Sequence, residues 1–164
     1  MSVLVLGLGN PLRGDDGVGC RVVEELTRRE LPPGVQVLDG GAAGLGLLDL
    51  MEGWERVVVV DAADVGREAG EFVRFTPADF RLLSAPDRFS LHHAGLSEVL
   101  ALADALGRAL PGMVIFGVQP AEVGWREGLS PAVETVLTAL ADSVLEEIGG
   151  ICPKGEDDAQ DSGD

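Results

Sequence analysis

Apolar runs alternate with segments of helical periodicity along most of the chain. Strands are predicted at 3–7, 35–38, 56–62, 70–75 and 113–118, and helices at 16–30, 42–52, 90–109 and 130–150. The strand at 56–62 begins with an unbroken run of valines after its first residue, as expected for a strand buried on both faces. This alternation predicts an α/β fold in which helices cover both faces of an open, mainly parallel sheet.

The ends of the last two helices carry capping signals. Ser90 suits the N-cap of the helix at 90–109, and Gly112 follows its end. Ser130 and Pro131 suit the N-cap and first position of the last helix, which Gly149 is expected to end. Both helices therefore have predicted boundaries.

The 164 residues predict one domain over 1–150, followed by an acidic tail at 151–164 that we expect to be disordered. The formal net charge of −16 makes nucleic acid a poor partner. No apolar run is long enough to span a bilayer, and no signal-peptide pattern is visible. Cys20 and Cys152 are far apart in the sequence, so we expect reduced thiols and a cytoplasmic protein. We expect no membrane contact.

In open parallel sheets, sites gather beyond the carboxyl ends of the strands. The opening loop, GLGNPLRGDDG, lacks both the dinucleotide-binding glycine spacing and the lysine of a phosphate-binding loop. Its two acids would repel a phosphate, and we expect one of them to cap the first helix. The polar residues that follow predicted strands are Asn10, Asp15, Asp16, Asp39, Asp61 and the segment 119–122.

His92 and His93 are the only histidines, and both fall near the start of a predicted helix. A helix N-terminus disfavours the imidazolium and so favours the neutral ring that binds metals. Two carboxylates and one imidazole at the strand ends would form an open site for a divalent metal such as nickel or zinc. Cys20, inside the first helix, is expected to be a packed thiol rather than a nucleophile.

The chain resembles the NiFe-hydrogenase maturation endopeptidases through five segments: VLGLGNPLRGDDGVGCRVVEEL, VLDGGAAG, VVVVDAAD, SLHHAGLSEVL and GVQPAEVGWREGLSPAVE. Their order and spacing match over 3–148. The resemblance implies a three-layer α/β/α sandwich around a twisted, mainly parallel five-stranded sheet. It also implies that the protein removes the C-terminal extension of a hydrogenase large-subunit precursor, in the cytosol, after nickel insertion.

The resemblance places the family's metal-contacting residues, which we also expect to be catalytic, at Asp16, Asp61 and His92. Asp39 matches an acid near the substrate channel, and we assign Asn10 to substrate binding as well. Ala42 stands where threonine is common, and His93 stands where glutamine is frequent. The nickel is expected to arrive with the precursor, so no permanent cofactor is expected.

Two chemical routes remain open: polarisation of a carbonyl or water by the metal, and general-base catalysis by a carboxylate as in an aspartyl protease. Two other functions are also weighed. One is a metal-dependent hydrolase of a small molecule on the same fold. The other is a peptidyl-tRNA-hydrolase-like enzyme, which the negative charge and the lack of an early histidine disfavour.

Overall fold

The computed structural model describes residues 1–41, 46–79, 90–91 and 94–151. Its strands are β1 (Val3–Leu8), β2 (Val35–Gly41), β3 (Arg56–Asp64), β4 (Phe72–Phe75), β5 (Ser90–Leu91) and β6 (Gly112–Val118). Its helices are the short 3-10 helix η1 (Gly14–Gly17), α1 (Val18–Thr27), α2 (Gly46–Met51), α4 (Ala94–Ala105) and α5 (Pro131–Ile151). Strands and helices alternate as the hydrophobic pattern predicts.

Five strands form the main sheet, in the order β2-β1-β3-β6-β4. The first four are parallel, and β4 runs antiparallel to β6 at one edge. The short β5 pairs antiparallel with the end of β3. The predicted α/β class, with a mainly parallel five-stranded sheet, is confirmed.

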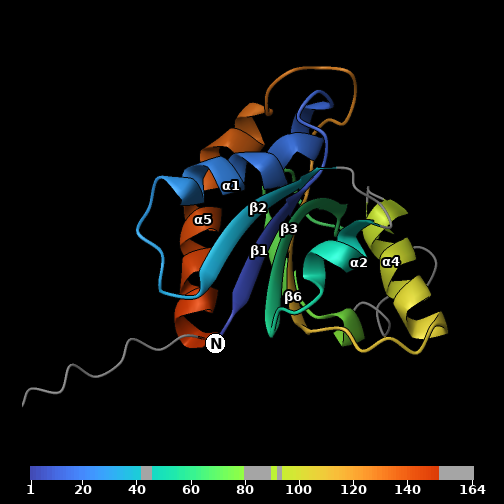
Figure 1. Cartoon of the computed structure of the whole chain (residues 1–164). Helices are drawn as coiled ribbons and strands as arrows, with labels where there is room; N and C mark the ends of the chain where they lie inside the picture. The colour runs from blue at the N-terminus through green and yellow to red at the C-terminus, as the bar shows by residue number, and fades with distance from the viewer. Residues whose placement is uncertain (42–45, 80–89, 92–93, 152–164) are drawn as a thin grey trace, which may run out of the picture.

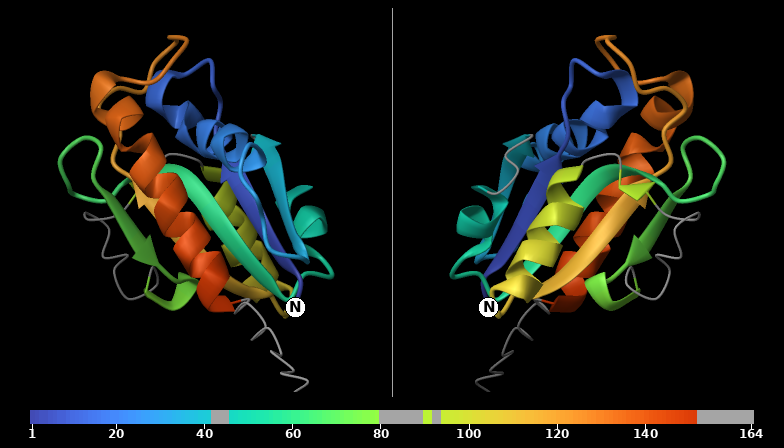
Figure 2. Two further views of the ribbon diagram at one scale, coloured as in Figure 1. Left: turned by 90° about the vertical axis from the view of Figure 1, so that its left-hand side faces the viewer. Right: turned by 90° about the vertical axis from the view of Figure 1, so that its right-hand side faces the viewer.

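Helices cover both faces of the sheet, giving three layers (Figures 1 and 2). On one face, α2 and α4 pack against Leu4, Leu6, Val57 and Val59. On the other face, α1 and α5 pack against Val3, Val5, Val58 and Val60. Alternate residues of β1 and β3 thus enter opposite cores, which explains why both strands are apolar throughout.

The prediction that Ser90 caps a helix over 90–109 is wrong. Ser90 and Leu91 instead pair with Asp64 and Ala63 of β3, and the helix α4 begins at Ala94. This pairing with a distant strand overrides the local capping signal.

The predicted C-terminal signals are also corrected. Gly107, not Gly112, follows α4: its φ is +64°, and the Arg108 N–H donates to the carbonyl of Ala103 in the pattern that often ends helices. Gly112 instead begins β6, and α5 continues through Gly149 to Ile151.

The predicted start of α5 is confirmed at Pro131, while the hydroxyl of the preceding Ser130 donates to Asp15 Oδ2. The first predicted helix is shorter than 16–30, since the segment 14–17 forms η1 before α1 begins. None of the described helices is both long and apolar enough to cross a membrane. The predicted acidic tail beyond Ile151 lies outside the described residues, as does the segment 42–45 of the second predicted helix.

Candidate functional site at the carboxyl edge of the sheet

The loop that follows β1 folds back tightly on its own strand. Gly9 has a φ of +116°, and a Cβ at this position would stand 1.8 Å from the carbonyl oxygen of Asp16. The Asn10 N–H donates to Asp16 Oδ2 over 2.9 Å. Only a glycine permits this approach, which holds the Asp16 side chain, 1% exposed, at the end of β1.

Asp61 lies at the same edge, near the end of β3. It is fully buried and opposite Gly117 of β6. Because side chains alternate along a strand, Asp61 shares the face of Val59 and Ala63, which pack toward α2 and α4. Neighbouring parallel strands therefore bring two buried carboxylates, Asp16 and Asp61, to one edge of the sheet.

The predicted third metal ligand, His92, lies outside the described residues, as does His93. The residue before it, Leu91, pairs with Ala63, two positions beyond Asp61. Among the described residues, no three His, Cys, Asp or Glu side chains lie together as a metal site would require. The metal hypothesis therefore depends on His92 joining the two carboxylates.

Asp15 has a structural task that differs from the predicted one. No side-chain capping bond is formed at the start of η1 or α1. The Asp15 carboxylate instead accepts hydrogen bonds from the N–H groups of Ala121 and Glu122 and from both the N–H and the hydroxyl of Ser130, at 2.7 to 3.1 Å. It thus joins the opening loop to the loop after β6 and to the N-terminus of α5, where a negative charge is favourable.

Asp39 is exposed at the end of β2 and contacts the thiol of Cys20. The thiol is buried in α1 and lies 3.4 Å from Asp39 Oδ1, which also accepts the Gly41 N–H at 2.8 Å. Burial, followed by the nearby Asp39 carboxylate, raises the pKa of Cys20 to about 12. The expected packed, unreactive thiol is consistent with this environment, and the substrate-binding role of Asp39 stays a prediction.

The Asn10 side chain is engaged in the loop itself. Its Oδ1 accepts the Leu12 N–H at 3.0 Å, which is a local turn that asparagine commonly forms. Gln119 at the end of β6 is similarly occupied, since its Oε1 accepts the N–H groups of Val65 and Arg67. These bonds give both residues structural roles, and substrate binding by Asn10 stays a prediction.

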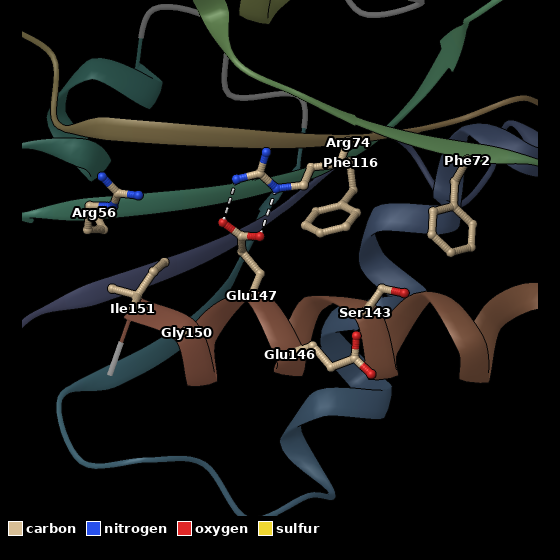
Figure 3. A pocket seen from close by; sticks show the side chains of 9 residues that line it. All are labelled: Arg56, Phe72, Arg74, Phe116, Ser143, Glu146, Glu147, Gly150 and Ile151. Carbon is tan, nitrogen blue, oxygen red and sulfur yellow. Dashed lines mark hydrogen bonds and ion pairs between the residues drawn. The ribbon is translucent and has the colours of Figure 1, made fainter. Parts of the chain in front are cut away.

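A hollow of about 680 Å³ lies away from the carboxyl edge, between β4 and the C-terminal half of α5 (Figure 3). Its polar groups are already paired in part, because Arg74 forms a two-pronged ion pair with Glu147 at 2.8 and 2.9 Å. None of the predicted site residues that the structure describes lines it. The candidate site is therefore the carboxyl edge rather than this hollow.

Comparison with known proteins identifies relatives over nearly the whole described chain. A family model described as hydrogenase maturation protease matches residues 20–147. The hydrogenase expression/formation protein HupD of Bradyrhizobium diazoefficiens is 39% identical over 152 residues, which cover 90% of this chain and 79% of HupD. The hydrogenase 2 maturation protease of Escherichia coli is 33% identical over 147 residues, covering 88% of this chain and 89% of that protein.

A solved structure agrees with these sequence matches. The hydrogenase maturating endopeptidase HybD from E. coli superimposes with a TM-score of 0.77 at 32% identity. The superposition covers 92% of this chain and 94% of HybD. The similarity therefore extends to the arrangement of the elements that carry the two buried carboxylates.

Proposed function

Because this chain belongs to the hydrogenase maturation proteases, a family of endopeptidases, we propose that it removes the C-terminal extension of a NiFe-hydrogenase large-subunit precursor. We further propose that it acts in the cytoplasm, after nickel has been inserted, and that it recognises that nickel. The membership favours this function over the small-molecule hydrolase and peptidyl-tRNA hydrolase alternatives.

The observation that carries the nickel proposal is the burial of two carboxylates: Asp61 near the end of β3, and Asp16 in η1, which lies against Gly9 just after β1. A buried carboxylate attracts a divalent cation more strongly than an exposed one, because less water screens the interaction. Carboxylate oxygens and one imidazole nitrogen are acceptable ligands for nickel but select poorly among divalent ions. Selectivity would then come from cysteine thiolates of the precursor, which present the ion as part of the substrate.

The residues of this chain have separate tasks in the proposal. Asp16, Asp61 and His92 hold the precursor's ion and so fix the position of the peptide bond. When bound, nickel supplies polarisation of a carbonyl or a water. One of the two carboxylates can instead accept a proton from the attacking water. In this proposal, Asn10 on the loop after β1 and Asp39 near the end of β2 contact the arriving polypeptide.

The test compares nickel-loaded and nickel-free precursor, each incubated with protease that has been treated with chelator and desalted. We expect mass spectrometry to detect a shortened C-terminus only for the loaded precursor. Asp16→Asn and Asp61→Asn should each reduce the cleavage rate by a factor on the order of a hundred or more. Asp49→Asn is the matched control, because Asp49 is exposed on α2 outside the site.

The outcomes separate the parts of the proposal. Efficient cleavage of nickel-free precursor would falsify the recognition of nickel while leaving the protease function in place. Failure to cleave either precursor would overturn the substrate assignment. Full activity of both site variants would remove Asp16 and Asp61 from the mechanism.

A further inference from the structure

Two loops far apart in sequence are joined at the carboxyl edge of the sheet. Arg13 and Arg126 form a parallel bridge: the Arg126 N–H donates to the carbonyl of Leu12, and the Gly14 N–H donates to the carbonyl of Arg126. The Asp15 N–H also donates to the carbonyl of Glu122 at 3.1 Å. In Figures 1 and 2, the opening loop in blue and the loop before α5 in orange stand together beyond the sheet.

A buried side chain of the first loop also binds the second loop. The Asp15 carboxylate, 1% exposed, binds the backbone of the second loop at Ala121, Glu122 and Ser130. Gly14 has a φ of +62°, and a Cβ there would stand 3.0 Å from the carbonyl oxygen of Glu122. The loops therefore form a fixed surface rather than two independent segments.

This surface presents apolar side chains to solvent. Trp125 is 82% exposed and Leu12 is 56% exposed, and they are two of four exposed large hydrophobic residues in the described chain. The Arg13 guanidinium lies over the Trp125 ring, 5.6 Å from its centroid. We call Leu12, Arg13 and Trp125 the edge platform.

The edge platform adjoins the candidate site. Leu12 and Arg13 belong to the loop that ends in Asp15 and Asp16, and the Asn10 N–H at its start is bonded to Asp16 Oδ2. Anything that covers the platform therefore lies on the same loop that positions Asp16. A partner bound at the edge platform is therefore relevant to the reaction only if it also reaches the candidate site.

We propose that the edge platform docks the protein substrate, by binding a segment that carries an apolar side chain next to a carboxylate. Tryptophan and arginine are the residues that most often dominate binding energy at protein interfaces. Arg13 has no ion pair among the described residues, whereas Arg126 is paired with Glu122. On a chain of net charge −16, Arg13 is thus a local point of attraction for an acidic group.

The proposal rests on the proposed function, because the substrate class is the hydrogenase precursor. It adds the surface through which that precursor is bound and the chemistry of the bound segment. It also separates recognition of the polypeptide from recognition of the ion: the edge platform performs the first, and the buried carboxylates perform the second.

The experiment measures the dissociation constant of the purified nickel-loaded precursor for the wild-type protease and its variants, together with cleavage kinetics. Trp125→Ala should weaken binding by about tenfold or more and raise KM while kcat stays close to the wild-type value. Trp125→Phe should retain most of the affinity. Arg13→Gln should weaken binding severalfold and reduce its dependence on salt.

Leu106→Ala is the matched control, since Leu106 is 61% exposed but follows α4, away from the joined loops. It should bind the precursor as the wild type does. Circular dichroism and thermal unfolding of each variant show whether the fold is intact.

Unchanged affinity of Trp125→Ala, with cleavage by the wild type intact, would overturn the docking surface and leave the proposed function standing. If the wild type binds the precursor without cleaving it, the proposed function fails, and the affinities of the variants still decide the docking proposal. A wild-type protein that does not bind the precursor overturns both. Loss of self-association in Trp125→Ala without loss of precursor binding would identify a second copy of this chain as the occupant and overturn the proposal.

Discussion

Gly19 of α1 lies so close to Val60 of β3 that a Cβ on Gly19 would stand 2.5 Å from the Val60 carbonyl oxygen. The same Cβ would stand 2.4 Å from the carbonyl oxygen of Leu8. The helix therefore rests directly on the backbones of β1 and β3. This contact fixes how close α1 lies to the sheet. It therefore also positions the preceding helix η1, which contains Asp16, against the sheet edge.

Gly19→Ala should destabilise the protein by about 1–3 kcal/mol, because backbone atoms on both strands would have to move. The destabilisation runs against helix propensity, because replacing glycine by alanine inside a helix normally raises stability by about 1 kcal/mol. Gly149→Ala in α5 is the control, since nothing lies within 4 Å of its Cβ position. Urea unfolding should show opposite signs for the two variants; a stabilised Gly19→Ala protein would contradict the close contact.

Asp15→Asn should lower the free energy of unfolding by about 2–4 kcal/mol, because an amide keeps only one acceptor oxygen for the four donors that now face a carboxylate. Hydrogen exchange should become faster at the amides of Ala121, Glu122 and Ser130. Asp49→Asn, exposed on α2, provides the comparison for removal of one charge. Exchange at these amides that matches the wild type would refute the anchoring role.

Cys20 should resist alkylation in the folded protein. With its pKa raised to about 12, mainly by burial and then by Asp39, almost no thiolate is present at pH 8. Iodoacetamide should therefore label a Cys152→Ser protein only after unfolding. Asp39→Asn should speed the labelling modestly, because it removes the nearby negative charge. Rapid labelling of the native protein would show that the thiol is accessible and ionised.

The ion pair between Arg74 and Glu147 predicts a pH-dependent contribution to stability. The Arg74 guanidinium holds the pKa of Glu147 below its usual range. The contribution is therefore present above the pKa that Glu147 has in the unfolded chain, and it is lost as the pH falls through the lower folded value. Because Arg74 is about half exposed, Glu147→Gln should cost under about 1 kcal/mol at pH 7.

The control for this prediction is Glu146→Gln, which removes the same charge from an exposed neighbour. Chemical unfolding at pH 7 and pH 3 should show a larger difference between the two variants at the higher pH. A Glu147→Gln effect that persists unchanged at pH 3 would assign it to packing rather than to the charge.

The two adjacent histidines should differ in function. His92→Ala should abolish cleavage of the loaded precursor, whereas His93→Ala should retain most of it, because side chains one position apart rarely reach the same ion. The measurement is the initial cleavage rate of each variant, checked for folding by circular dichroism. Equal loss of activity in both folded variants would reject the assignment of His92.

Much of the fold follows from local patterns in the sequence. The apolar runs of β1, β3 and β6 and the start of α5 at Pro131 are read correctly, since burial on both faces and a proline in the first helical position each leave a local signature. The strand β5 is missed because its partners, Ala63 and Asp64, lie more than twenty residues earlier. No local pattern encodes such a pairing.

In the candidate site, too, some features have a local signature in the sequence and others depend on residues far apart in the chain. The rule that sites follow strand ends selects Asp16 and Asp61, and both are buried near the carboxyl edge of the sheet, while their part in a site stays a prediction. The role of Asp15 is misjudged because its partner Ser130 lies 115 residues further along the chain. The edge platform is likewise invisible in the sequence, since Leu12 and Trp125 become neighbours only through the bridge between Arg13 and Arg126.

The bond between Asp15 and Ser130 also sets an order of events during synthesis. A ribosome completes the opening loop long before it reaches Ser130, so the growing chain has no donor there to hold that loop in place. The surface that would receive a substrate is assembled only when the last helix begins to form. A chain that has not yet reached Ser130 therefore lacks the bonds that join the opening loop to the start of α5.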